Sequence, residues 1–386
     1  MFIIVTILTN CDVAIIGGIL MSEIKKIAVM TGGGDCPGLN PVIRAVTKTA
    51  TMKYGLEVVG IKHGYRGLYL GGDEFVNLNY DTVKNIISKG GTILYSSNKD
   101  NLFDYTYEDE NGNICHGDVS DVGVENLKKN GIDALIVIGG DGTLTSGRDF
   151  SRKGVKVIGV PKTIDNDLAA TDTTFGFDTA VTNAVDAIDK LKTTAESHSR
   201  IIVVEAMGRY AGFLALSMGI AGAADAILIP EIEYDINKVA DCLKNNIKRG
   251  KTHAIVVVAE GAKPKGGEIV VSKVVEDSPD PIRLGGIANV VAEQLEKLVG
   301  LEARATILGH VQRGGSPTAN DRILSTRYGA YAVELLMQGK FGNMVTLDGS
   351  SMSYESLENV IGANKAVDPN GELVMIAEAT GVSFGR

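Results

Sequence analysis

The sequence has no tryptophan, and its 386 residues include only four cysteines. Cys11, Cys36, Cys115 and Cys242 form no Cys-x-x-Cys pair, and no histidine stands at zinc-ligand spacing from them. A disulfide framework and a structural zinc site are therefore not expected. Scattered, reduced cysteines are typical of a cytoplasmic protein, which is the location we predict.

An excess of basic residues is also missing. The chain has 38 Lys and Arg against 47 Asp and Glu, which gives a formal net charge of −9. Binding to nucleic acid or to an anionic membrane surface is not expected of such a chain. Small anionic ligands are not excluded, because they respond to local arginines rather than to net charge.

A long uninterrupted apolar run is absent as well. Residues 1–20 are largely apolar, but Asn10 and Asp12 interrupt them and no basic segment precedes them. This pattern disfavours a signal anchor or a membrane span. We expect residues 1–21 to be an N-terminal extension, disordered or loosely docked, ahead of a natural start near Met21.

Glycine is abundant, with 47 residues, which suits many tight turns between strands and helices. Short apolar runs alternate with longer amphipathic stretches, a pattern that predicts parallel sheets built from βαβ units. The fold class expected is α/β, with two doubly wound, Rossmann-like domains whose mainly parallel sheets face each other across a cleft. The predicted strands are 26–30, 57–61, 134–138, 155–160, 200–205, 226–229 and 253–259. The predicted helices are 40–54, 81–88, 143–153, 178–198, 210–221, 236–249 and 287–298.

Two segments break this alternation. Residues 103–120 are acidic and turn-rich around Asn111-Gly112, which predicts an inserted hairpin or loop at the surface. Residues 271–281 are expected to form a second surface segment.

Residues 161–167, Pro-Lys-Thr-Ile-Asp-Asn-Asp, place two carboxylates directly after a predicted buried strand. Polar groups at the carboxyl end of such a strand face the crevice where open α/β sheets bind ligands. Asp165 is a candidate general base for a substrate hydroxyl, with Thr163, Asn166 and Asp167 orienting the reactants. The alternative is an Asx-rich turn whose side chains only satisfy the backbone.

Two glycine-rich turns follow other strands. Residues 31–40 (TGGGDCPGLN) and 139–143 (GGDGT) each lead into a helix, where backbone N–H groups and the helix dipole favour phosphate. Asp141 is placed to bind Mg²⁺, directly or through water, and Gly142 and Thr143 to meet phosphate oxygens. Neither turn matches a dinucleotide fingerprint or a P-loop.

Arginines gather at strand or loop ends in the second half of this acidic chain: Arg200, Arg209, Arg304 and Arg313, with His310 beside the last. Guanidinium groups bind phosphate in a bidentate way, and neighbouring glycines allow close approach. Surface ion pairing would explain any one of them alone. Together these parts predict phosphoryl transfer from a Mg²⁺-bound donor to a hydroxyl of a phosphorylated acceptor.

Taken in order, the motifs TGGGDCPGLN, IGGDGT, PKTIDND, EAMGRYAG, ILIPE and ATILGHVQRGG resemble the 6-phosphofructokinase family over about residues 24–330. The resemblance implies a kinase that transfers a phosphoryl group from ATP to the 1-hydroxyl of fructose 6-phosphate in glycolysis, giving fructose 1,6-bisphosphate and ADP. It implies catalytic roles for Asp165, as the base, and for Thr163, Asp167 and Arg209. Asp141 matches the Mg²⁺-linked aspartate.

The resemblance also implies binding residues for both substrates and a shared site. The donor contacts that it implies are Gly34, Tyr65, Asn98, Lys99, Gly142, Thr143 and Lys162. The sugar-phosphate contacts are Thr163, Asp165, Asp167, Met207, Gly208, Arg209, Glu231, His310 and Arg313. Arg200 and Arg304 match arginines that reach a neighbouring subunit's site, which implies a homo-oligomer, a homotetramer or alternatively a homodimer.

The donor is the point on which this sequence departs from the family pattern. Lys162 is typical of pyrophosphate-using members, and Asn98 stands where many ATP-using members have arginine. Gly142 is the choice of ATP-using members, whereas pyrophosphate users carry an aspartate that would crowd and repel a nucleotide. ATP is therefore favoured, and a pyrophosphate-dependent fructose 6-phosphate 1-phosphotransferase is the alternative. A non-catalytic, nucleotide-binding regulatory subunit is a further alternative, disfavoured because Asp141, Asp165 and Arg209 are intact.

The resemblance predicts the domain organisation too. The donor-binding domain is expected to comprise residues 22–176 and about 312–362, and the fructose 6-phosphate-binding domain residues 177–311 and about 363–386. Arg44 and Lys48 lie where bacterial members bind effectors, but a solvated basic helix face explains them as well, so no effector is predicted.

Overall fold

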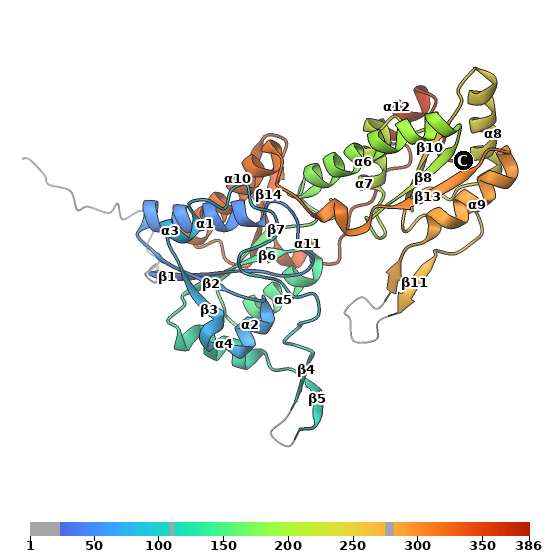
Figure 1. Ribbon diagram of the computed structural model, residues 1–386. Coiled ribbons are helices and arrows are strands. Elements are labelled where there is room, and N and C mark those ends of the chain that lie inside the picture. The colour runs from blue at the N-terminus through green and yellow to red at the C-terminus, as the bar shows by residue number, and fades with distance from the viewer. Residues whose placement is uncertain (1–23, 109–111, 275–281) are drawn as a thin grey trace, which may run out of the picture.

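The computed structural model describes residues 24–108, 112–274 and 282–386, which form two lobes, each with a sheet between helices (Figure 1). The extension predicted at residues 1–21 lies outside these residues, as do Asn111 and most of the surface segment expected at 271–281. The predicted α/β class with mainly parallel sheets is confirmed.

The sheet of the first lobe has seven strands in the order β15-β14-β7-β6-β1-β2-β3. The strands are β1 (Lys26–Thr31), β2 (Glu57–Ile61), β3 (Phe75–Leu78), β6 (Ala134–Gly139), β7 (Val157–Pro161), β14 (Asn343–Asp348) and β15 (Ser351–Ser356). The five central strands are parallel, and β3 and β15 pair antiparallel at the two edges. Strands β1, β6 and β7, which are buried almost throughout, therefore end side by side at one edge of the sheet.

Helices cover both faces of this sheet. One face packs against α1 (Leu39–Tyr54), α3 (Tyr80–Val83) and α10 (Ala319–Met337). The other face packs against α2 (Tyr65–Leu70), α4 (Ser120–Lys129), α5 (Asp141–Arg152) and α11 (Leu357–Val360). A capping box at Asn79 starts helix α3, but the helix ends after one turn at Val83. It is therefore shorter than the predicted helix 81–88.

The sheet of the second lobe has four parallel strands in the order β13-β8-β10-β9. They are β8 (Ile201–Ala206), β9 (Ala226–Leu228), β10 (Ala254–Ala259) and β13 (Ala303–Ile307). One face packs against α6 (Phe177–His198), α7 (Phe213–Ala221) and α12 (Glu372–Ala379), and the other against α8 (Ile236–Lys248) and α9 (Ile287–Val299).

Two hairpins stand out from the lobes (Figure 1). Strands β4 (Tyr105–Glu108) and β5 (Ile114–Gly117) confirm the hairpin predicted within residues 103–120. Strands β11 (Val271–Val274) and β12 (Ile282–Leu284) form the second.

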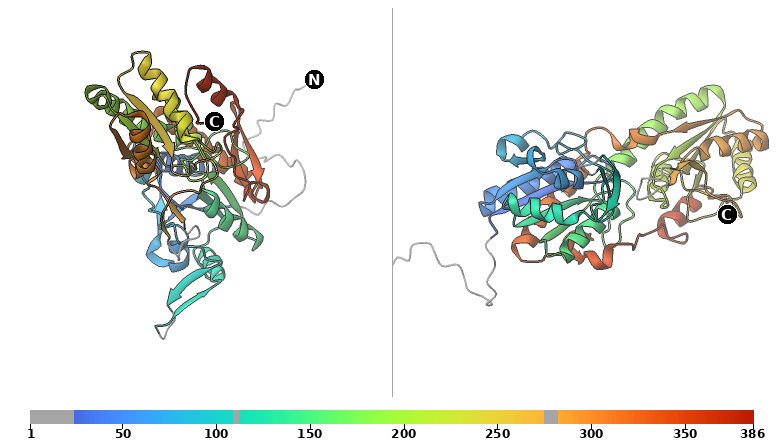
Figure 2. Two further views of the ribbon diagram at one scale, coloured as in Figure 1. Left: turned by 90° about the vertical axis from the view of Figure 1, so that its right-hand side faces the viewer. Right: turned by 90° about the horizontal axis from the view of Figure 1, so that it is seen from below.

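The chain passes between the lobes after β7, after the 3-10 helix η2 (Gly309–Arg313) and after α11 (Figures 1 and 2). Each lobe is thus built from two segments that are separated in the sequence. This arrangement fits the discontinuous domains expected from the sequence, whose boundaries stay a prediction.

Among the described residues, no helix is both long and apolar enough to cross a membrane.

Candidate active site

Three polar turns meet at the carboxyl ends of β1, β6 and β7. The N–H of Gly32 donates to the carbonyl of Ile138 at 2.9 Å, and the N–H of Lys162 donates to the carbonyl of Gly139 at 2.9 Å. The ammonium group of Lys162 donates to the carbonyl of Gly34. Residues 161–167 are thus hydrogen-bonded to both glycine turns, and the first glycine turn is also bonded to the end of β6.

The turn at residues 139–143 is tightly packed around Thr143, whereas the space beside Gly142 is open. Thr143 is buried, and a Cβ on Gly32 or on Gly139 would come within 2.7 Å or 2.3 Å of its side chain. The Tyr65 hydroxyl donates to the Thr143 carbonyl at 2.8 Å, and its ring stacks on Phe150. Burial raises the pKa of Tyr65 well above its usual value. Tyr65 therefore supports the turn as a hydrogen-bond donor.

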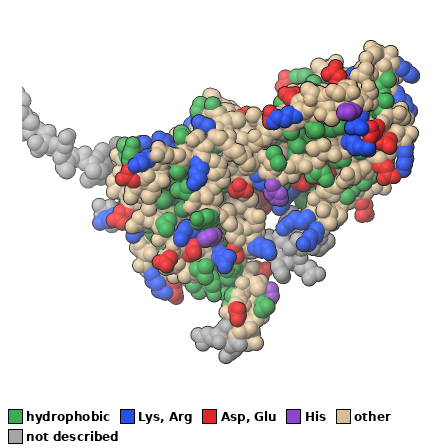
Figure 3. Space-filling view, in the orientation of Figure 1, with side chains coloured by type: hydrophobic (Ala, Val, Ile, Leu, Met, Phe, Trp, Pro, Cys, Tyr) green, Lys and Arg blue, Asp and Glu red, His purple; other side chains and the backbone are tan. Residues whose placement is uncertain are grey.

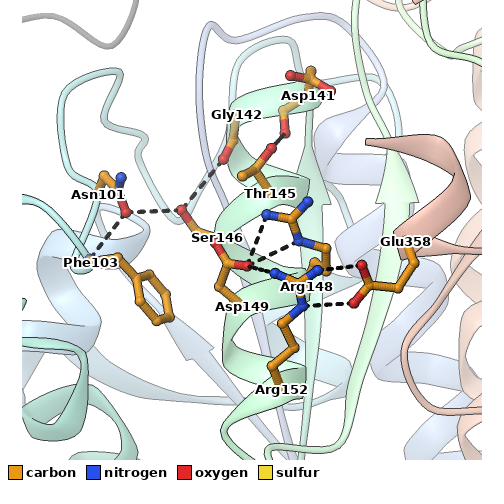
Figure 4. Close-up of polar contacts among 10 residues, drawn as sticks. All are labelled: Asn101, Phe103, Asp141, Gly142, Thr145, Ser146, Arg148, Asp149, Arg152 and Glu358. Atoms are coloured by element: carbon orange, nitrogen blue, oxygen red, sulfur yellow. Dashed lines mark hydrogen bonds and ion pairs between the residues drawn. The ribbon is translucent and has the colours of Figure 1, made fainter. Parts of the chain in front are cut away.

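Gly142 differs from these glycines, because a Cβ built on it would meet nothing within 4 Å. It occupies the first turn of α5, where the Ser146 hydroxyl has two alternative acceptors, the Gly142 carbonyl and the amide oxygen of Asn101, each at 3.4 Å (Figure 4). Thr145 donates to the Asp141 carbonyl at 2.8 Å. The first turn of α5 is thus braced by its own side chains while the space beside Gly142 stays open.

Lys162 is a buried cation among these turns. Its side chain is only 3% exposed, and burial lowers its pKa to about 8, despite the opposing effect of Cys36 and Asp165. Asn98 and Lys99, which the sequence also assigned to the donor, are both exposed. The loop that carries them contacts the first glycine turn, since the Gly33 N–H donates to the Ser97 carbonyl at 3.0 Å.

Residues 163–167 form a turn with a buried carboxylate. The Asp165 N–H donates to the Thr163 hydroxyl at 3.0 Å. Asp165 is 7% exposed, and its Oδ1 atom is buried with no hydrogen-bond partner among the described residues. An unpaired buried carboxylate oxygen costs free energy unless a ligand satisfies it, so this atom points to a bound group.

Asp167 lies within electrostatic reach of two other carboxylates. Burial and the negative charges of Asp165 and Asp141 raise its pKa to about 6, while the charge of Arg209 acts in the opposite direction. The Asp141 side chain accepts a hydrogen bond from the Gly362 N–H at 3.2 Å. The charges of Asp141, Asp165 and Arg209 therefore all act on Asp167.

Arg209 belongs to a turn after β8 in the second lobe. Its backbone has φ +50°, and its N–H donates to Glu260 at 3.0 Å. A Cβ on Gly208 would come within 2.7 Å of the Ala211 carbonyl, at φ +137°, so only glycine fits this position. This irregular turn also explains why α7 begins at Phe213 rather than near Tyr210, as predicted.

The segment of η2 joins the two lobes. Gln312 is fully buried, and its amide oxygen accepts from the Met207 N–H at 2.8 Å. Arg313 reaches back to the first glycine turn, where its guanidinium donates to the Asp35 carbonyl at 3.1 Å. His310 is exposed in the same 3-10 helix. On the face shown in Figure 3, acidic, basic and histidine side chains gather where the two lobes meet.

Arg200 and Arg304 do not join this cluster. Arg200 precedes β8, and Arg304 pairs with Ile202 near the start of β13, so both lie at the amino ends of strands whose carboxyl ends carry the site. Glu302 binds both guanidinium groups, that of Arg200 at 2.6 Å. Within one chain these arginines lie about a strand length from Arg209, roughly 20 Å.

Glu231 is engaged by the backbone. One carboxylate oxygen accepts from the N–H groups of Gly212 and Val367, both at 2.9 Å. The other, Oε2, is buried with no hydrogen-bond partner among the described residues.

Sequence reasoning missed three residues near these turns: Glu260, Gln312 and Lys365. Glu260 directly follows β10, so the rule that polar groups collect at strand ends could have found it. Burial, together with the charges of Asp165 and Glu205, raises its pKa to about 7. Gln312 lies within the motif ATILGHVQRGG, but the motif predicts no role for it. Lys365 has no local signal, because it contacts residues about 200 positions earlier in the chain.

Asp141 fits a Mg²⁺ ion that is bound by one or two carboxylates together with substrate phosphates. No cluster of three His, Cys, Asp or Glu side chains able to hold a metal ion occurs in the described ranges. Mg²⁺ commonly binds through one or two carboxylates plus substrate phosphates, so a full protein cage is not required. The negative charges of Asp141 and Asp165 raise the pKa of Asp167, and a bound cation would offset this concentration of negative charge.

The fold and these turns define a class: a two-lobed α/β protein in which glycine turns of the kind that binds phosphate lie near Arg209 and Arg313. A sequence profile described as Phosphofructokinase matches residues 26–336. The chain belongs to the phosphofructokinase family.

Named relatives agree with this assignment. The chain is 66% identical over 366 residues, 95% of this chain and 100% of the relative, to "ATP-dependent 6-phosphofructokinase 2" of Clostridium perfringens. It is 46% identical to a "Pyrophosphate--fructose 6-phosphate 1-phosphotransferase" of Streptomyces coelicolor, covering 93% of this chain and 100% of the relative. Among solved structures, phosphofructokinase from Saccharomyces cerevisiae superposes with a TM-score of 0.74 at 32% identity. That match covers 87% of this chain and 44% of the yeast chain.

Proposed function

We propose that this chain is a 6-phosphofructokinase, which transfers the γ-phosphoryl group of ATP to the 1-hydroxyl of fructose 6-phosphate. The products are fructose 1,6-bisphosphate and ADP, and the reaction is a step of glycolysis. The observation that carries the proposal is the Oδ1 atom of Asp165 after β7, which is buried and has no hydrogen-bond partner in the part of the chain that the structure describes. It lies two residues from Asp167, on which the charge of Arg209 acts. The similarity to the Clostridium perfringens enzyme supports ATP as the donor.

In this proposal Asp165 accepts the proton of the 1-hydroxyl as that oxygen bonds to the γ-phosphorus. The bond from the γ-phosphorus to the bridging oxygen breaks, and ADP leaves with that oxygen. Thr163 orients Asp165 through the hydroxyl that accepts its N–H. Asp167 places a second carboxylate beside the base, and Arg209 stabilises the charge on the transferring group.

The donor is bound by the glycine turns of the first lobe. Backbone N–H groups near Gly34, Gly142 and Thr143 contact its phosphates at the N-terminus of α5. Asp141 would hold Mg²⁺, which supplies positive charge for the donor phosphates when it is bound. Open space beside Gly142 leaves room for a nucleotide.

The acceptor is bound by the second lobe. Met207 and Gly208 position the sugar, and His310 and Arg313 bind its 6-phosphate. Glu231 stays a predicted contact, and its buried Oε2 has no hydrogen-bond partner among the residues that the structure describes. Arg200 and Arg304 complete the 6-phosphate site of a neighbouring copy, because they lie at the opposite end of their strands. The assembly proposed is a homotetramer, or a homodimer. The cytoplasmic location stays a prediction.

One observation favours a second donor. Lys162 is buried beside Gly33 and Gly34 of the first glycine turn, where its charge would favour the compact anion pyrophosphate. The purified protein, assayed with Mg²⁺, fructose 6-phosphate and either ATP or pyrophosphate, separates the two. We expect turnover with ATP; activity with pyrophosphate alone would make the reaction readily reversible and overturn the donor assignment.

The base assignment has its own test. Asp165→Ser should lower kcat by several orders of magnitude, roughly 10³-fold or more, with a modest change in fructose 6-phosphate binding. Turnover close to that of the wild type would rule out Asp165 as the base.

A further inference from the structure

The segment at residues 362–367 passes from the first lobe to the second between α11 and α12 (Figures 1 and 2). In the first lobe its backbone contacts two aspartates of the site. The Gly362 N–H donates to the Asp141 carboxylate at 3.2 Å, and the Lys365 N–H donates to the Asp167 carbonyl at 2.8 Å. Residues 362–367 therefore contact both the glycine turn at 139–143 and the turn at 163–167, which carries the proposed base.

The same segment also touches the second lobe. The Val367 N–H donates to Glu231 at 2.9 Å, and the same carboxylate oxygen accepts from the Gly212 N–H at 2.9 Å. The ammonium group of Lys365 lies 5.5 Å from the centroid of the Phe213 ring, within the range of a cation–π contact. Gly212 and Phe213 start α7, directly after the turn that carries Arg209.

The side chain of Lys365 is fully engaged on the first-lobe side. Its ammonium group donates to the carbonyls of Thr171 and Asp172, both at 2.8 Å, and to the amide oxygen of Asn166 at 3.4 Å. Three acceptors match the three N–H donors of an ammonium group. Lys365 thus binds two consecutive carbonyls and the residue between the site aspartates.

Asn166 needs such support. Its φ of +55° is in the left-handed region, which costs free energy for any residue with a side chain, although asparagine tolerates it better than most. Its amide oxygen also accepts from the Thr174 N–H at 3.0 Å. Because Asn166 lies between Asp165 and Asp167, its backbone conformation fixes the direction of both carboxylates.

A lysine is a costly residue in this position. Burial lowers the pKa of Lys365 to about 8, against the opposing charges of Asp172 and Asp167. A neutral donor would satisfy the same carbonyls without the desolvation cost of a charge. A cation, however, can contact the Phe213 ring while it holds the turn, and so reach both lobes.

We propose that Lys365 is a positioning residue for phosphoryl transfer: it holds the Asn166–Asp167 turn and ties it to Phe213, so that the base and Arg209 stay aligned across the lobes. The proposal rests on the function proposed above. It does not require Lys365 to touch either substrate.

Steady-state kinetics of Lys365→Met test the proposal, using whichever donor the wild type turns over. Methionine keeps much of the length of the side chain but loses the charge and the donors. We expect kcat to fall about 10- to 100-fold, as a misplacement of about 1 Å would cause, while KM for the donor changes less than about threefold. Lys365→Arg, which keeps the charge and N–H donors, should recover part of the loss. An unchanged kcat in Lys365→Met would overturn the proposal.

A matched control separates positioning from general stability. Lys251 is another partly buried lysine, bound to the buried Asp225 at 2.6 Å, far from the site in the second lobe. Lys251→Met should lower the melting temperature without changing kcat. If Lys365→Met does not fold, Phe213→Leu is the second variant, because it leaves every hydrogen bond of Lys365 in place. We expect kcat to fall about threefold or more in Phe213→Leu, and an unchanged kcat would count against the contact.

The absence of tryptophan gives a test that is independent of activity. In Phe213→Trp the indole is the single tryptophan, and its emission should change when Lys365→Met is added to the same protein. Identical spectra of the single and double variants would overturn the contact between Lys365 and position 213. A wild type that transfers no phosphoryl group would overturn the proposed function, whereas the spectra would still decide the contact.

Discussion

Gly142→Asp tests most directly how this chain selects its phosphoryl donor. The fold itself should accept the change, because a Cβ at this position meets nothing within 4 Å and the backbone is not in the left-handed region. Position 142 lies in the first turn of α5, where a negative charge is favoured by the helix dipole, by about 0.3–1 kcal/mol. Replacing a helical glycine adds a few tenths of a kcal/mol more. The melting temperature should therefore stay the same or rise.

The effect on ATP should be large and opposite in sign. A carboxylate about 4 Å from a phosphate charge costs about 4 kcal/mol at an effective dielectric constant of 20, and about 1 kcal/mol in bulk water. Gly142 is exposed, so an intermediate value of about 2–3 kcal/mol is reasonable. This corresponds to a fall in kcat/KM for ATP of roughly 30- to 150-fold. The bulk of the side chain adds to the loss, because the nucleotide loses room.

The assay compares kcat/KM for ATP, pyrophosphate and fructose 6-phosphate in wild type, Gly142→Asp and Gly142→Asn. Asparagine has the size of aspartate without its charge, so it separates crowding from repulsion. Gly117→Asp is a control for the charge alone, because Gly117 also has open space at Cβ but lies in the β4–β5 hairpin. We expect ATP use to fall much more than pyrophosphate use. If Gly142→Asp kept kcat/KM for ATP within about threefold of the wild type, position 142 would not face the nucleotide.

Three further predictions concern the same crevice. Lys162→Met should lower any use of pyrophosphate more than use of ATP in parallel kinetic assays, because it removes a buried cation beside the Gly34 carbonyl; an equal loss with both donors would contradict a role in donor choice. Asp167 has a pKa raised to about 6, so it binds a proton as pH falls through that value, and kcat/KM should fall on the acid side near pH 6. That acid limb should move or vanish in a pH profile of Asp167→Asn, and an unaltered limb would assign it to another group. Tyr65→Phe leaves the Thr143 carbonyl without its donor and should lower the free energy of unfolding by about 1–3 kcal/mol in urea titrations. It should raise KM for ATP without affecting KM for fructose 6-phosphate, whereas equal changes in both would show that the effect is not confined to the donor turn.

Much of the donor and base region was predictable from local pattern. Strands β1, β6 and β7 are continuous apolar runs, and each is followed at once by glycines or carboxylates. In a parallel sheet these ends must lie at one edge, so the proximity of the three turns follows from the strand order. Predicted and observed bounds of these strands differ by two residues or fewer. The short turn of α3 and the late start of α7 were not predictable in this way, because capping and positive φ angles override the apolar periodicity.

Other features depend on contacts between distant parts of the chain. The sequence by itself determined the fold class, the glycine turns, and the buried strand that presents Asp165, because periodicity and strand-end chemistry are local. Only the tertiary structure decided that Asp165 Oδ1 is buried without a partner among the described residues, that Arg313 reaches the Asp35 carbonyl, and that Arg200 and Arg304 lie at the far ends of their strands. It alone revealed Lys365, whose role depends on a turn about 200 residues earlier. Burial and charge proximity arise when two lobes pack together, and no local pattern encodes them.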